Sequence, residues 1–153
     1  MIFKFNDFII QVESKITETN EKVIAPIGLE KYSSKPIMGW KYRTREITIF
    51  DSLAFKNKGD KKYYAVISDI FVFIELIEIL KAFNGNKLNI SKEYNISGKF
   101  TAKTTQKDSE IFLKIHFKNY SNSLFLDKFE CSSLAAKFTK ILNRCEAWQE
   151  QEA

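Results

Sequence analysis

The stretch EIFLKIHFK, Glu110 to Lys118, alternates between two kinds of side chain and decides how the second half of the chain folds. Successive side chains of a strand point to opposite faces, so one set is expected to line a core and the other to face outward. The two sets are Ile111, Leu113, Ile115 and Phe117, and Phe112, Lys114, His116 and Lys118. The outward set calls for an explanation, because an exposed phenylalanine such as Phe112 is not expected on a face that only contacts water.

The segments around this strand extend it into a sheet closed by a helix. GKFTAKTT, residues 98–105, reads as a strand joined to Glu110–Lys118 through the polar QKDS, which predicts a hairpin. KLNIS before it and SLFL after it are further short strands. Asp127 followed by Glu130 then predicts a capping box that starts a helix. The core face of this helix is expected at Leu134, Phe138, Ile141, Cys145 and Trp148.

The first half of the chain repeats this plan of strands followed by a helix. IFKFNDFIIQVESKI, the short KVIAPI, Gly39–Phe50 and KYYAVI read as strands. The alternation changes phase within Gly39–Phe50, which predicts a bulge or bend near Glu46. Ser68 is expected to cap a helix that runs to about Phe83. That helix is apolar nearly all round, so it should be covered by a sheet and another helix, or by another subunit.

Together these segments predict an α+β fold in a single domain, residues 1–153. Two strand-rich repeats, about 1–85 and 86–148, are each closed by a helix, with antiparallel sheets and the helices packed on one face. A short acidic tail, 149–153, follows. The opposite sheet face is left free.

Composition limits the classes of function. The chain has 153 residues, 44% of them hydrophobic, and a formal net charge of +5, which favours a folded protein with a polyanionic partner. Cys131 and Cys145 lie too far apart on the predicted helix to form a disulfide with each other. No signal peptide or membrane span is recognisable, so an intracellular location is expected, in the cytoplasm, the nucleoid or a phage-infected host cell.

The sequence offers little for catalysis. The chain has one histidine and lacks the phosphate-binding, dinucleotide-binding and zinc-protease motifs. His116 fits an exposed strand residue that assists binding better than a catalytic base. We therefore expect no enzyme, no cofactor and no metal site.

Basic and aromatic residues share faces in both halves, the combination that binds single-stranded nucleic acid. Lys99 and Lys103 are expected to face the same way as Phe112, Lys114, His116 and Lys118. The first half supplies Trp40, Lys41, Tyr42, Arg43 and Arg45, with Lys61, Lys62 and Tyr63 on a strand that could neighbour them. Lysines on exposed strands also protect against edge-to-edge aggregation, and Trp40 or Tyr42 could instead be core residues.

The second half resembles the Whirly family of single-stranded-DNA-binding proteins in the order of hairpin, short strand, capped helix and terminal Trp. YYAVISDIFVFIELIEILKAFNG resembles the helix that closes the first half of those proteins, and PUR-alpha-type repeats share the strands-then-helix plan. The Lys-Gly-Lys-Ala-Ala-Leu-Ser-Val motif of plant Whirly proteins is absent, and SGKFTAKT, 97–104, is only a loose echo of it. The resemblance implies binding across the sheets and helix-mediated oligomerisation, often tetrameric.

These features predict a single-stranded nucleic-acid-binding protein, for DNA rather than RNA, with low sequence specificity. Its expected setting is replication, recombination, repair or transcription, and its expected partner besides nucleic acid is a second copy, as a dimer or tetramer joined through the apolar helices. The alternative is a small protein-interaction or inhibitor module of phage or mobile-element origin, in which the aromatic residues would anchor a protein interface.

Overall fold

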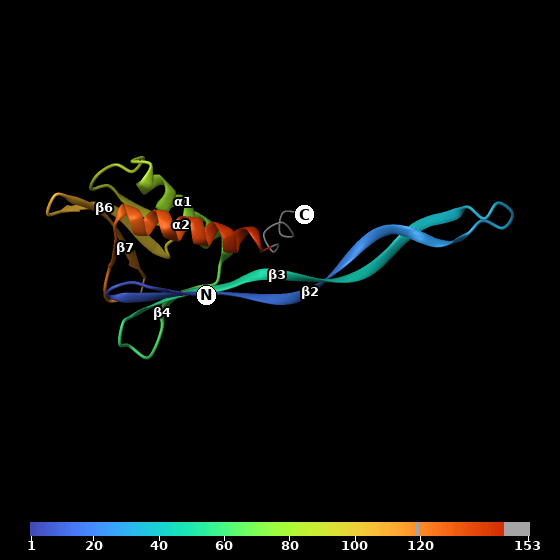
Figure 1. Cartoon of the computed structure of the whole chain (residues 1–153), viewed down its shortest axis with the longest axis horizontal. Coiled ribbons are helices and arrows are strands. Elements are labelled where there is room, and N and C mark those ends of the chain that lie inside the picture. Colours follow the sequence, from blue (N-terminus) through green and yellow to red (C-terminus); the bar gives the residue numbers. More distant parts are fainter. Residues whose placement is uncertain (119, 146–153) are drawn as a thin grey trace.

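A computed structural model describes residues 1–118 and 120–145 and shows an α+β fold with two antiparallel sheets and two helices (Figure 1). Each sheet has four strands in chain order, and a helix follows each sheet. The first half contains β1 (Ile2–Lys4), β2 (Phe8–Leu29), β3 (Pro36–Asn57), β4 (Tyr64–Ile67) and α1 (Ile70–Asn84). The second half contains β5 (Glu93–Ile96), β6 (Phe100–Lys107), β7 (Glu110–Phe117), β8 (Leu124–Leu126) and α2 (Lys128–Asn143). The acidic tail lies outside the described residues.

One hydrophobic core joins the two halves. Both sheets and both helices contribute to the same cluster of buried side chains. The rings of Phe55 on β3 and Phe117 on β7 lie 4.0 Å apart between centroids, and those of Phe73 on α1 and Phe138 on α2 lie 5.2 Å apart. The two halves therefore share one hydrophobic core.

Local sequence signals determine where the helices begin. In α2 the Asp127 carboxylate accepts a hydrogen bond from the Glu130 backbone N–H at 2.7 Å, and the Glu130 carboxylate accepts one from the Asp127 N–H at 3.1 Å, which confirms the predicted capping box. In α1 the cap is Asp69, which accepts from the Phe71 N–H at 2.9 Å, so the prediction of Ser68 as the cap is wrong by one residue. Both side chains suit a cap, and the adjacent carboxylate takes the position.

The apolar surface of α1 is covered within the chain. Eight of its fifteen residues are buried against α2 and the sheets, while Phe71, Glu78 and Lys81 remain on its exposed edge. This confirms the expectation that a sheet and a second helix cover it. The apolar surface of α1 therefore does not need another subunit to cover it. On α2, Leu134, Phe138 and Ile141 are buried as predicted. Cys145 is also buried but lies beyond the end of the helix at Asn143, and Trp148 lies outside the described residues.

The first sheet extends into a long two-stranded arm, which the sequence did not predict. β1 pairs only with Ile9–Gln11 of β2, and β4 pairs with β3 only at Leu53 and Phe55. Beyond these points β2 and β3 continue as an antiparallel ribbon that projects away from the helices (Figure 1). We call residues 14–50 the arm. Residues 30–35 form its tip.

The bulge predicted near Glu46 lies at the base of the arm instead. Ser14 pairs with Phe50 and Glu13 pairs with Ser52, so Asp51 is the extra residue on β3. The bulge changes the phase of β3: Leu53 and Phe55 point into the core on one side of it, and Phe50 does so on the other. The phase change read from the sequence is real, and its position was wrong by five residues.

Candidate nucleic-acid interface

The β6–β7 hairpin confirms the alternation from which the prediction started. Phe100 and Ala102 on β6 and Leu113, Ile115 and Phe117 on β7 are each at most 2% exposed. Ile111, near the start of β7 on the same core-facing side, is partly buried. The alternate residues of both strands therefore point away from the core, because side chains of a pleated strand alternate between its faces.

These outward residues form rows across the second sheet, and we call them together the basic sheet face. Its rows follow the strand register: Thr105 and Phe112; Glu93, Lys103, Lys114 and Phe125; Asn95, Thr101 and His116. Neighbouring strands lie about 4.8 Å apart, so members of one row are within reach of each other. The face presents cations, polar groups and two aromatic rings on one surface.

The centre of the basic sheet face places two lysines side by side. Lys103 and Lys114 are directly opposite each other on β6 and β7. Glu93 lies on the far side of Lys103, yet within the described part of the chain neither lysine comes within ion-pair distance of a carboxylate. Like charges directly opposite each other destabilise a sheet. An anion bound between the two ammonium groups would relieve that repulsion.

Two further lysines extend this face at the end of the sheet. Ser97 and Gly98 have positive φ angles of 52° and 67°, the backbone of a tight hairpin turn, and Lys99 follows them. The Lys118 backbone N–H donates to the Lys99 carbonyl at 2.9 Å, which holds the two lysine backbones together. A shallow hollow beside them is lined by Asn95, Gly98, Lys99, Phe100, Thr101, His116 and Lys118. His116 Nδ1 lies 3.3 Å from the Ser123 hydroxyl, so a polar neighbour orients its ring.

Sequence reasoning missed one residue of this face, Phe125. It pairs directly with Lys114 of the neighbouring strand and is 50% exposed, while Leu124 and Leu126 on either side of it are buried. The pattern of SLFL contained the signal, since the middle residue of a three-residue strand with two buried neighbours must point outward. Phe112 is more covered than Phe125, and both border a hollow near the start of α2.

The basic and aromatic residues of the first half lie on the arm, away from the basic sheet face. Trp40 and Tyr42 are 61% and 75% exposed, so neither is a core residue. They occupy one face of the ribbon, and Lys41, Arg43 and Arg45 occupy the other. The expectation of one surface that combines these cations with these aromatic rings is therefore wrong for the arm.

The two arginines of the arm share a carboxylate. Arg43 Nε donates to Glu21 at 2.8 Å, and Arg45 Nε lies 3.4 Å from the other oxygen of the same group. The hydrogen bond from Arg43, with the positive charge of both arginines, lowers the pKa of Glu21 below its ordinary value. This pairing offsets part of the charge that a phosphate would meet there.

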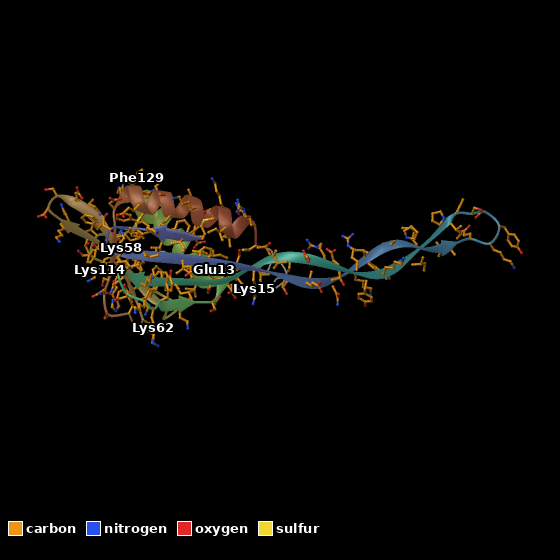
Figure 2. The ribbon with its side chains drawn as sticks, turned by 60° about the horizontal axis from the view of Figure 1, so that its bottom comes forward. Glu13, Lys15, Lys58, Lys62, Lys114 and Phe129 are labelled. Carbon is orange, nitrogen blue, oxygen red and sulfur yellow. The ribbon has the colours of Figure 1, made fainter. Side chains whose placement is uncertain are left out.

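Lys61, Lys62 and Tyr63 do not lie beside Trp40–Arg45, so that part of the prediction is wrong. They belong to the loop between β3 and β4, and β4 pairs with β3 only at Leu53 and Phe55, at the body end of the arm. The Tyr63 ring has Lys56 Nζ 5.0 Å from its centroid. Figure 2 shows Lys62 on this loop and Lys15 where the arm leaves the body.

The described residues hold no cluster of three or more histidine, cysteine or acidic side chains that could bind a metal ion. Cys131 and Cys145 are both free and buried. Burial raises the pKa of both thiols, so at neutral pH they stay protonated and are poor nucleophiles. Among the helices of the described chain, none has the length and apolar character that crossing a membrane requires.

Comparison with known proteins adds no family to this picture. No protein-family model matches the chain, and neither a curated protein nor a solved structure does. The site is therefore assigned from its own geometry and chemistry.

Proposed function

We propose that this chain binds single-stranded nucleic acid through the basic sheet face, with DNA rather than RNA as the main ligand and little sequence preference. It would act by binding and not by catalysis, in replication, recombination, repair or transcription. The plan of four strands and a helix, present twice, supports the resemblance to Whirly and PUR-alpha-type proteins. We propose that relationship on the pattern alone.

The cross-strand pair Lys103–Lys114 is the observation that carries this proposal. The sequence places two positive charges opposite each other where the sheet would be more stable with opposite charges. Lys99 and Lys118 lie at the end of the same face. Four lysines in this arrangement suit a run of backbone phosphates, which bind by charge without reading sequence.

Two aromatic residues favour a single strand over a duplex. Phe125 is half exposed beside Lys114, and Phe112 stands on the same face of β7. Base faces are free to stack on such rings only when the bases are unpaired, and each stacked base contributes about 1–3 kcal/mol. An open sheet face also does not fit into a duplex groove, which admits one helix or a two-stranded ribbon.

The arm contributes less to this proposal than the sheet does. Trp40 and Tyr42 could stack with bases, yet Lys22 is the one cation on their face of the ribbon, which also carries Glu18 and Glu46. A dimer or tetramer joined through the apolar helices is also not supported by α1, because the structure leaves no large apolar face of this helix uncovered.

Removing the two rings tests the stacking step. Phe112→Ala with Phe125→Ala should weaken binding to a single-stranded oligonucleotide by about thirtyfold or more, with an unchanged salt dependence, in fluorescence anisotropy. Phe129→Ala is the matched control, because Phe129 is 81% exposed on α2 and lies outside the basic sheet face. Equal affinities of the double variant and the control would rule out stacking on this face.

The second candidate function is a small protein-interaction or inhibitor module, and the arm is the observation that favours it. Nine of the fifteen exposed large hydrophobic residues of the described chain lie between positions 16 and 42. Exposed apolar clusters of this kind mark protein interfaces. Capture of one host protein by the full chain after nuclease treatment, lost when Trp40 is changed to Glu, would favour this function over the first.

A further inference from the structure

One face of the arm forms an uninterrupted ladder of exposed side chains. The register pairs its rungs as Ile16–Thr48, Glu18–Glu46, Asn20–Thr44, Lys22–Tyr42, Ile24–Trp40 and Pro26–Met38. We call this set the arm ladder. All of its residues are exposed except Thr48, whereas the opposite face is partly covered along most of its length. On that opposite face Ile27 packs onto Gly39, where an added Cβ would lie 2.5 Å from the Ile27 side chain.

The outer end of the arm ladder is apolar, and nothing within the described chain covers it. Ile24, Met38 and Trp40 are 54–61% exposed, and Lys22 Nζ lies 4.9 Å from the centroid of the Trp40 ring. A two-stranded ribbon is only marginally stable in water on its own. A ribbon of this length with its aromatic residues uncovered is stabilised when a second surface packs on it.

The free edge of β2 in the ribbon is poorly suited to pairing with another strand. Pro26 lacks a backbone N–H, and Ile27 forms a bulge at the register shift between Pro26 and Gly28. Docking is therefore expected on the face of the ribbon and not along the β2 edge. A nucleic-acid strand is a poor occupant for the arm ladder, because its one cation, Lys22, is outnumbered by Glu18 and Glu46.

We propose that the arm ladder is a homodimerisation surface on which the arms of two copies pack face to face and antiparallel. Charge complementarity favours a second copy. Glu18 lies directly opposite Glu46, and within the described residues neither carboxylate forms an ion pair. Two carboxylates so placed destabilise a single arm.

A two-fold axis through the Ile24–Trp40 rung resolves this repulsion. Counted in rungs from Ile24–Trp40, six steps toward the body reach Glu18–Glu46. Six steps toward the tip reach positions 31 and 34, because Ile27 is the bulge residue and forms no rung. The Glu18–Glu46 rung of one copy therefore faces the tip of the other. That tip carries Lys31 and Lys35 with one acid, Glu30. The contact is made twice in a symmetric dimer, with the apolar rungs between.

The available area is sufficient for a dimer of modest affinity. Trp40 and Tyr42 together offer roughly 250 Å² per arm at their observed exposures, since aromatic side chains bury about 150–250 Å² each. The exposed aliphatic side chains of the outer arm offer roughly as much again. Two arms would thus bury on the order of 1,000 Å², the lower limit for a specific interface.

Analytical ultracentrifugation of the full chain without nucleic acid tests the dimer over roughly 1–100 µM. The wild type should dimerise in this range. Ile24→Lys with Trp40→Glu should weaken the dimer by at least about tenfold while keeping an attractive pair across the ribbon. Lys61→Glu with Lys62→Glu, in the β3–β4 loop, should leave it unchanged. A monomeric wild type, or a dimer insensitive to the first variant, would overturn the proposal and leave the arm to a different protein.

Charge reversal tests the antiparallel register. Glu18→Lys with Glu46→Lys should weaken the dimer, although it leaves a like-charge rung within each arm. Lys31→Glu with Lys35→Glu should also weaken it, and the four changes together should restore it because both ends of the contact are reversed. If the fourfold variant dimerises no more tightly than either double variant, this antiparallel register is refuted. Nucleic-acid binding by the basic sheet face does not enter either experiment, so each proposal can fail without the other.

Discussion

Reversal of one charge at the centre of the basic sheet face should make the protein more stable and a poorer binder at once. Lys114→Glu converts the repulsive pair with Lys103 into an attractive one. Cross-strand pairs contribute roughly 0.2–1 kcal/mol, so replacing a repulsive pair by an attractive one should raise the free energy of unfolding by about 0.5–1.5 kcal/mol. Lys114 is the better member to change, because Glu93 already lies beside Lys103.

The two effects have separate assays. Thermal unfolding followed by circular dichroism should show a rise in Tm of a few degrees, since 1 kcal/mol shifts Tm by about 2–4 °C in a chain of this size. Fluorescence anisotropy with a single-stranded oligonucleotide should show about a tenfold or greater loss of affinity and a salt slope smaller by about 0.7. Lys62→Glu, the same change on the exposed β3–β4 loop, should alter neither quantity appreciably.

The opposite signs are what make the variant informative. A structural role for Lys114 predicts that stability and binding fall together. Unchanged affinity, or a lower Tm, would refute the assignment of the Lys103–Lys114 pair as an anion site.

Three further outcomes follow from the geometry. Asp127→Ala removes the cap of α2 and should lower the free energy of unfolding by about 0.5–2 kcal/mol in urea denaturation, with oligonucleotide affinity unchanged. Cys131 and Cys145 should react with a thiol reagent at pH 8 only after unfolding, because both are buried with raised pKa values; rapid reaction of the native chain would contradict their placement. The lowered pKa of Glu21 means that its ionised form favours the folded arm above the ordinary carboxyl pKa, and this contribution is lost as pH falls through the lowered value; Arg43→Gln should move the Glu21 pKa back toward normal in an NMR titration.

The parts of the fold set by local chemistry were predictable from the sequence. The β6–β7 hairpin follows from strict alternation with a polar turn between the strands, and the start of α2 follows from Asp127 and Glu130 three residues apart. Each signal lies within a few residues. The α1 cap was missed by one position because Ser68 and Asp69 are both suitable caps, and only the folded backbone selects between them.

The arm could not be predicted because its pattern is that of an ordinary strand. Alternation in Gly39–Phe50 does not reveal whether a third strand lies beside it, and the strands of the arm have 22 residues where about five or six are usual. Pairing of Ile24 with Trp40 is a contact between distant positions that no local signal specifies. For the same reason Trp40–Arg45 was expected on the same surface as Lys61–Tyr63, and the structure separates them.

The most direct test of the proposed function is the affinity of the full chain for single-stranded and double-stranded oligonucleotides of the same sequence across a salt series. Binding to the single strand should be tighter by at least about tenfold, with a log–log salt slope of about −2.8 if the four lysines Lys99, Lys103, Lys114 and Lys118 each meet one phosphate. Equal affinity for both forms, or no binding at low salt, would contradict the account.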